Sequence, residues 1–86
     1  MNTGIYILKC ANDRYYIGST NDIERRFAEH CRGNVKATKN LLPVELAMFQ
    51  ACKTLLEARR LEQRLKKKKS RDIIEKIVKD GYIKFM

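Results

Sequence analysis

Two short runs near the start of the chain decide the fold: Gly4-Ile5-Tyr6-Ile7-Leu8-Lys9-Cys10, followed by Arg14-Tyr15-Tyr16-Ile17-Gly18-Ser19. Both are rich in β-branched and aromatic residues, which is typical of strands. The residues between them, Ala11-Asn12-Asp13, have the composition of a tight turn. We therefore predict an antiparallel hairpin whose continuously apolar first strand suits the centre of a sheet.

The chain beyond the hairpin alternates between helical and extended patterns. Ile23, Phe27 and Cys31 recur every four residues and mark an amphipathic helix, which Gly33 ends. Residues 34–42 show no clear period and are read as a loop before Pro43. We further predict a strand over 44–52, a helix after the Thr54 cap as far as Lys68, a helix between Ser70 and Gly81, and a tail 82–86 packed on the core.

Length and element order set the fold class. A chain of 86 residues has no room for a second core, so residues 1–86 form a single domain, with its core at about 3–68 and a C-terminal helix and tail at 70–86. The expected class is α+β, a three-stranded antiparallel sheet flanked by three helices.

Charge points to the kind of partner. There are 19 Lys and Arg against 10 Asp and Glu, and the resulting formal charge of +9 favours a polyanion as partner. Hydrophobic residues make up 44% of the chain, so it is globular rather than disordered. Composition therefore leaves nucleases, repressors and ribosomal proteins as candidate classes.

The cysteines and the hydropathy pattern indicate where the protein works. Cys10, Cys31 and Cys52 are odd in number and widely spaced, which favours buried, inert thiols in a reducing compartment over a disulfide framework or a zinc site. No apolar run approaches the roughly 20 residues of a membrane span, and the N-terminus lacks the pattern of a signal peptide. We expect a cytoplasmic protein.

Helical geometry selects a few polar residues. At about 100° per residue, His30 borders the apolar side of the first helix and Arg26 lies nearer to it than Arg25, which faces solvent. In the second helix Glu62 flanks the apolar stripe, whereas Glu57 is explained by its place in the first turn. Arg26, His30 and Glu62 are therefore the candidates for a site.

Each of these signals has a simpler explanation when taken alone. His30 fits a hydrogen-bonded boundary histidine, and the tyrosines fit sheet packing. Glu62 fits a surface charge paired with Arg59 or Lys66 at helical spacing. The lysine run 66–69 fits a solvated helix end.

Taken together, the motifs carry a family resemblance. Gly4-Ile5-Tyr6 and Tyr16-Ile17-Gly18 on one hairpin resemble the defining motif of the GIY-YIG endonuclease superfamily. The likeness extends over most of the chain, to about Lys68, and is greatest to small, single-domain, stand-alone members. It includes the segments 21–30, Gly33, Thr38-Lys39, 42–46, 57–62 and 65–67.

The resemblance implies a one-metal site that hydrolyses a phosphodiester. Carried onto this sequence, it makes Glu62 the ligand of Mg²⁺ or Mn²⁺, Tyr6 and Tyr16 the catalytic tyrosines, and Arg26 and His30 their partners. We expect Tyr16 to act as the general base, His30 to assist proton transfer and Tyr6 to orient the nucleophile or phosphate. The roles of the two tyrosines could be exchanged.

The expected function is therefore a nuclease, acting on DNA in repair or recombination. Contacts with phosphates would come from the loop lysines and from the basic run after the second helix: Lys36, Lys39, Lys66, Lys67, Lys68, Lys69 and Arg71. The alternative is a basic nucleic-acid-binding module of the same fold without activity. The polar residue, often asparagine, that follows the glutamate helix in some larger relatives is absent here, since no asparagine follows Asn40. We expect no membrane and no small-molecule cofactor, and leave open a partner protein that supplies specificity.

Overall fold

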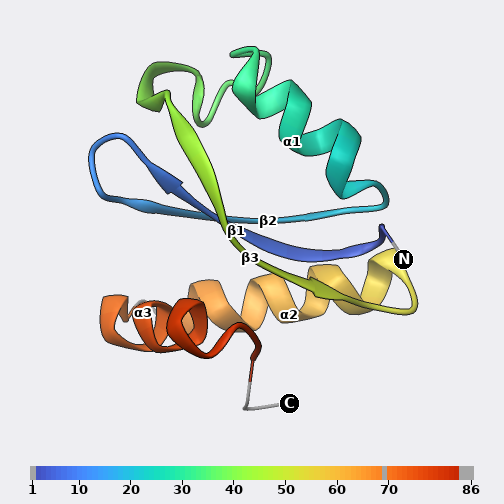
Figure 1. Cartoon of the computed structure of the whole chain (residues 1–86). Helices are drawn as coiled ribbons and strands as arrows, with labels where there is room; N and C mark the ends of the chain where they lie inside the picture. The colour runs from blue at the N-terminus through green and yellow to red at the C-terminus, as the bar shows by residue number, and fades with distance from the viewer. Residues whose placement is uncertain (1, 69, 84–86) are drawn as a thin grey trace.

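The computed structural model describes residues 2–68 and 70–83. Strands β1 (Gly4–Cys10), β2 (Tyr15–Thr20) and β3 (Val44–Ala51) form one antiparallel sheet in the order β2-β1-β3. Helix α1 (Ile23–Cys31) covers one face of this sheet, and α2 (Leu55–Lys68) and α3 (Arg71–Asp80) lie on the other (Figure 1). The predicted α+β class, with a three-stranded antiparallel sheet and three helices, is confirmed.

Side chains on the central strand alternate between two apolar clusters. Ile5 and Ile7 pack with Ala58, Leu61 and Leu65 of α2 on one face. Tyr6 and Leu8 of the same strand belong to the cluster under α1 on the opposite face. Because β1 has hydrogen-bonded neighbours on both sides and apolar layers on both faces, its sequence is continuously apolar, as predicted.

Side-chain caps begin each α-helix, and those at Thr54 and Ser70 were predicted from sequence. Asp22 accepts a hydrogen bond from the backbone N–H of Arg25, and Ser70 accepts one from Ile73, at 3.3 Å each. Thr54 accepts from the N–H of Glu57 at 3.1 Å, which satisfies a free donor in the first turn of α2. Gly81 ends α3 with a φ of 84°, a left-handed conformation that favours glycine.

The structure corrects several boundaries. Strand β2 begins at Tyr15 rather than Arg14 and ends at Thr20, and β3 ends at Ala51 rather than Cys52. The expected loop over 34–42 contains a 3₁₀ helix, η1 (Lys39–Leu41). The N–H groups of Thr38 and Lys39 both bond the carbonyl of Val35, and this turn buries Val35 and Thr38 against α1.

The tail and the cysteines complete the core. Ile83 is buried and its N–H donates to Gln50 Oε1 at 2.8 Å, so this part of the tail packs as predicted, while 84–86 lie outside the described residues. Cys10 and Cys52 are buried free thiols, and burial raises the pKa of both. Cys31 is exposed, so the expectation of burial was wrong for it, because it sits on the outer side of the last turn of α1. No helix among the described residues combines the length and apolar character needed to cross a membrane.

Candidate active site

The two motif glycines permit close contacts within the sheet, with Tyr6 at Gly18 and with Gln50 at Gly4. Tyr6 pairs with Gly18 across β1 and β2, and its ring lies directly over that glycine. A Cβ atom at Gly18 would lie 2.5 Å from both Cζ and Oη of Tyr6, a distance at which one group must move. A Cβ atom at Gly4 would lie 2.1 Å from the carbonyl oxygen of Gln50. Glycine at position 18 therefore lets the Tyr6 hydroxyl extend across the edge strand.

His30 joins the tyrosine to the loop after α1. Its Nε2 lies 2.8 Å from Tyr6 Oη and its Nδ1 lies 2.7 Å from Thr38 Oγ1. Tyr6, His30 and Thr38 are all fully or almost fully buried. The sequence placed His30 at the boundary of the core, whereas the structure buries it completely because Thr38 covers its second nitrogen. Thr38 was missed as a site residue, since nothing in its local sequence indicates this contact.

The neighbours of Tyr6 decide which nitrogen of His30 carries the proton. The Arg26 side chain lies near enough to act on the ionisation of Tyr6, and a guanidinium can only donate hydrogen bonds. Tyr6 then has its own proton free to give to His30 Nε2. We infer that His30 is the neutral tautomer with hydrogen on Nδ1, which donates to Thr38 Oγ1.

Tyr16 lies against the same histidine. The ring centroids of Tyr16 and His30 are 5.1 Å apart in an edge-on arrangement. Those of Tyr16 and Tyr6 are 6.3 Å apart, and these two rings are tilted relative to each other. Tyr16 is only half-buried, whereas Tyr6 is 1% exposed. We call Tyr6, Tyr16 and His30 the tyrosine–histidine cluster. Within this cluster, Tyr16 is more exposed to solvent than Tyr6.

Burial also shifts the ionisation of the cluster. Desolvation raises the pKa of Tyr6 to about 12, although the hydrogen bond from Arg26 acts in the opposite direction. Desolvation lowers the pKa of His30, and the positive charge of Arg26 lowers it further, while Glu29 opposes the change. At neutral pH both Tyr6 and His30 are therefore uncharged.

The lowered pKa of His30 predicts a loss of stability in mild acid. The unfolded chain takes up a proton below about pH 6.5, whereas the folded protein resists it, so the free energy of unfolding should fall as pH drops from 6.5 through the lower folded-state pKa. His30 is the single histidine of the chain. Urea unfolding between pH 5 and 7.5 should show this slope in the wild type and a flatter profile in His30→Gln. Parallel profiles would contradict the assignment.

Glu62 reaches the hairpin from the other face of the sheet. Its Oε1 accepts a hydrogen bond from Ser19 Oγ at 2.6 Å, and Lys66 forms an ion pair with the second oxygen. The carboxylate is 19% exposed, and its charge contributes to the raised pKa of Tyr6. Glu62 therefore lies at the β2 edge and does not point away from the hairpin. The Lys66 pairing considered from sequence is present as well.

Within the described part of the chain, Glu62 has few other metal-binding side chains around it. Among the described residues, no three His, Cys, Asp or Glu side chains lie close enough to form a metal cage. A single carboxylate beside a hydroxyl fits an ion such as Mg²⁺, which keeps most of its water ligands and takes one or two carboxylates. Glu62 and Ser19 fit such an ion if the ion pair between Lys66 and the Glu62 carboxylate is broken.

A basic pocket adjoins this edge of β2. It has a volume of about 350 Å³ and is lined by Ser19, Thr20, Asn21, Arg25, Arg26, Leu55 and Arg59. Arg26 donates to Glu29 at 3.0 Å, and Arg25 donates to Asn21 Oδ1 at 2.9 Å. We call it the arginine pocket. From the sequence, Arg26 was selected for a site, Arg25 was placed in solvent, and Arg59 was considered only as a partner for Glu62. The pocket could not be predicted, because it forms where α1, α2 and the end of β2 meet.

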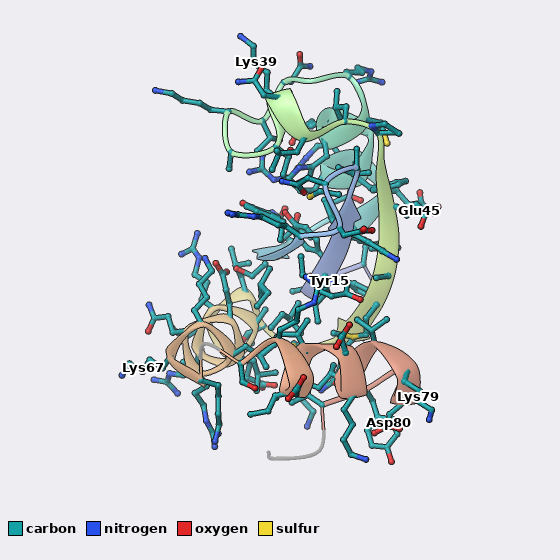
Figure 2. All side chains as sticks on the ribbon, turned by 90° about the vertical axis from the view of Figure 1, so that its left-hand side faces the viewer. Tyr15, Lys39, Glu45, Lys67, Lys79 and Asp80 are labelled. Carbon is teal, nitrogen blue, oxygen red and sulfur yellow. The ribbon has the colours of Figure 1, made fainter. Side chains whose placement is uncertain are left out.

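The basic residues expected to grip phosphates are divided between two layers. Lys66, Lys67 and Lys68 end α2 and Arg71 begins α3, while Lys36 and Lys39 lie in the loop beyond α1. Figure 2 shows Lys39 and Lys67 on opposite sides of the molecule. Lys69 lies outside the described residues. The tyrosine–histidine cluster, Arg26 and Glu62 are thus brought together at one edge of the sheet. Of the expected lysines, Lys66 reaches this edge through its ion pair with Glu62, whereas Lys36 and Lys39 lie in the other layer.

One edge of this sheet thus carries the tyrosine–histidine cluster on one face and, on the other, Glu62 hydrogen-bonded to Ser19. The model of the GIY-YIG catalytic domain matches residues 2–77, and the chain belongs to the GIY-YIG family.

Relatives of similar size agree with this assignment. The chain is 43% identical over 63 residues to a UPF0213 protein of Listeria innocua, covering 72% of this chain and 70% of the relative. It is 38% identical over 63 residues to a UPF0213 protein of Halobacterium salinarum, covering 72% and 82%. The solution NMR structure of a UPF0213 protein from Bacillus halodurans is similar with a TM-score of 0.57 and 35% identity, over 92% of this chain and 84% of that one.

Proposed function

We propose that the protein is a divalent-metal-dependent endonuclease that hydrolyses phosphodiester bonds in DNA, in repair or recombination. The observation that carries this proposal is the 2.8 Å hydrogen bond between Tyr6 and His30, formed beside Tyr16. Arg26 and Glu62 both act electrostatically on the same tyrosine. A base candidate, a cation and a carboxylate therefore surround one edge of the sheet, as phosphodiester hydrolysis requires.

Glu62 is the residue that would hold Mg²⁺ or Mn²⁺. When bound, such an ion neutralises charge on the phosphate and stabilises the leaving oxygen. Ser19 supports Glu62 by donating to Oε1, which fixes the direction of the carboxylate. Ser19 is in this sense a positioning residue.

Tyr16 is the proposed general base. In its deprotonated form, the Tyr16 phenolate oxygen takes a proton from the attacking water and becomes the hydroxyl, as the water oxygen bonds to phosphorus and the bond from phosphorus to the leaving oxygen breaks. Tyr6 keeps its proton at neutral pH because its pKa is raised to about 12, which suits an orienting role.

His30 acts in this scheme through Tyr6. Both of its nitrogens already have partners, since Tyr6 and Thr38 occupy them. It therefore holds the buried hydroxyl in place and can receive its proton if the roles of the tyrosines are exchanged. Arg26 places a planar set of donors where charge grows on the non-bridging oxygens.

The test is cleavage of labelled linear, flapped and branched DNA, and of RNA, with Mg²⁺, Mn²⁺ or EDTA. Tyr16→Phe should lower the rate by at least about 10²-fold, the lower range for loss of general acid–base catalysis. Tyr82→Phe is the matched control, since Tyr82 is exposed and lies in the C-terminal segment. Cleavage that persists in EDTA, or equal activity of Tyr16→Phe and Tyr82→Phe, would refute the mechanism.

One observation favours the second candidate, a binding module without activity. The ion pair of Lys66 with Glu62 already compensates the carboxylate that a metal would use. This reading predicts salt-dependent binding of nucleic acid with no cleavage under any metal condition. Lys66→Ala distinguishes the two, because it should enhance metal-dependent protection of the fold from heat if Glu62 is a ligand and leave melting independent of metal if it is not.

A further inference from the structure

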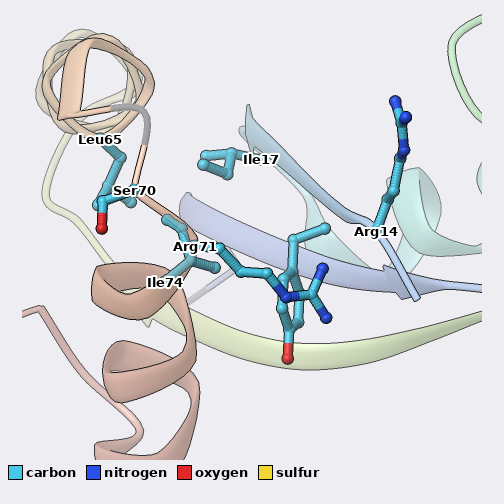
Figure 3. Close-up of a pocket in the computed structure, with 7 residues that line it drawn as sticks. Arg14, Ile17, Leu65, Ser70, Arg71 and Ile74 are labelled. Atoms are coloured by element: carbon cyan, nitrogen blue, oxygen red, sulfur yellow. The ribbon is translucent and has the colours of Figure 1, made fainter.

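A second pocket opens beside β2, between the hairpin and the junction of α2 with α3. It has a volume of about 230 Å³ and is lined by Arg14, Tyr15, Ile17, Leu65, Ser70, Arg71 and Ile74 (Figure 3). Except for the phosphate contact expected of Arg71, none of these residues has a part in the mechanism above. We call it the β2–α3 pocket.

The lining combines an apolar floor with an aromatic ring and cations. Ile17, Leu65 and Ile74 supply aliphatic surface, and Tyr15 packs against the same cluster. The guanidinium of Arg71 lies over the Tyr15 ring, 5.3 Å from its centroid, and its side chain is 52% exposed. Arg71 also pairs with Glu75 at 3.5 Å. Such a lining suits a flat, weakly polar group attached to an anion.

The position of the pocket relates it to Glu62. Successive residues of a strand point to opposite faces, so Tyr15, Ile17 and Ser19 share one face of β2. Ser19 is hydrogen-bonded to Glu62, and Tyr15 lies four residues away, about 13 Å along the strand. Figure 2 shows Tyr15 between the strands of the sheet and α3. One extended nucleic-acid strand can therefore pass Glu62 and reach the pocket.

We propose that the β2–α3 pocket binds one unpaired nucleotide of the strand whose phosphodiester lies at Glu62. The base packs against Tyr15 and the aliphatic floor, and the adjoining phosphates pair with Arg14 and Arg71. This inference rests on the proposed function, because it treats the pocket as part of the same substrate path. A base inside a duplex is stacked and paired and cannot enter, so the preferred substrate has an unpaired segment next to the cleaved bond.

The inference is tested by binding rather than by cleavage. Fluorescence anisotropy with a short labelled oligonucleotide, single-stranded or annealed to its complement, is measured in EDTA. Tyr15→Ala should weaken single-strand binding at least about 5-fold, the lower range for loss of one base–aromatic contact, and leave duplex binding nearly unchanged. Tyr15→Phe keeps the ring and should bind like the wild type. Tyr82→Ala, which removes an exposed tyrosine elsewhere, is the control.

A strand of the same length without bases separates base contacts from phosphate contacts. The wild type should bind this abasic strand more weakly than the intact one, and Tyr15→Ala should show a much smaller difference between them. Arg71→Ala should weaken binding to both the intact and the abasic strand. Arg32→Ala is its control, because Arg32 follows α1 on the opposite face of the sheet and its removal tests the loss of one positive charge alone. The proposal would be overturned if a free nucleoside monophosphate displaced the labelled strand as effectively as unlabelled strand does. Such a result would indicate a nucleotide site unconnected with the substrate.

These results do not depend on catalysis. If the protein cleaves but Tyr15→Ala binds single strands like the wild type, the pocket proposal fails and the nuclease proposal stands. If the protein never cleaves but Tyr15→Ala selectively loses single-strand affinity, the nuclease proposal fails and the pocket is a subsite of the binding module. Equal loss of single-strand and duplex affinity in a folded Tyr15→Ala also overturns the inference.

Discussion

Glu62→Gln is expected to lower the rate of DNA cleavage by at least about 10³-fold while leaving the fold intact. Glu62 is the carboxylate at the β2 edge that bonds Ser19 of the hairpin and influences Tyr6. Glutamine keeps the shape and can still accept from Ser19, but it loses the charge that would hold a divalent cation. The measurement is the single-turnover rate over a range of Mg²⁺ and Mn²⁺ concentrations.

Glu57→Gln is the matched control on the same helix. Glu57 is exposed in the first turn of α2, where its charge favours the helix N-terminus. Its rate should stay close to the wild type, and binding of both variants should keep its dependence on salt. A Glu62→Gln protein that cleaves like Glu57→Gln would remove Glu62 from the mechanism.

Gly18→Ala is expected to destabilise the fold by about 2–4 kcal/mol. The new Cβ would lie 2.5 Å from Tyr6 Cζ and Oη, and the ring is held there by its hydrogen bond to His30. Moving the ring costs packing and the buried hydrogen bond together. For a domain of this size the melting temperature should fall by roughly 10–20 °C, measured by circular dichroism.

A double-mutant cycle identifies the cause. In the background Tyr6→Ala, where the ring is absent, Gly18→Ala should cost far less than in the wild type. Gly81→Ala is the comparison, because its cost comes from a φ of 84° with no atom near the new Cβ, and it should be the same in both backgrounds. Additivity of Gly18→Ala with Tyr6→Ala would show that the contact is not the source of the cost.

Much of the site was predictable from helix geometry. The apolar period of α1 distinguished Arg26 from Arg25 and placed His30 near the core, and the period of α2 selected Glu62. The structure agrees for His30, which is fully buried, and for Glu62, which is mostly covered, whereas Arg25 lines the arginine pocket beside Arg26. A regular helix makes such predictions possible because each residue's direction follows from its number.

The residues that were missed depend on contacts between distant segments. Ser19 meets Glu62 across 43 positions of sequence, and Thr38 reaches His30 from an irregular loop. The arginine pocket likewise takes residues from β2, α1 and α2. No periodicity relates these positions, so local patterns could not predict their meeting.

The sequence by itself determined the helices and strands, their caps and the hairpin that carries the two tripeptide motifs. These features depend on backbone preferences and on the local pattern of apolar residues. Only the tertiary structure decided that α1 and α2 pack on opposite faces and still bring His30 and Glu62 to the same edge. The physical reason is the position of β2 at the edge of the sheet. Because Gly18 has no side chain, Tyr6 extends over β2 on one face, while Ser19 of the same strand hydrogen-bonds Glu62 on the other.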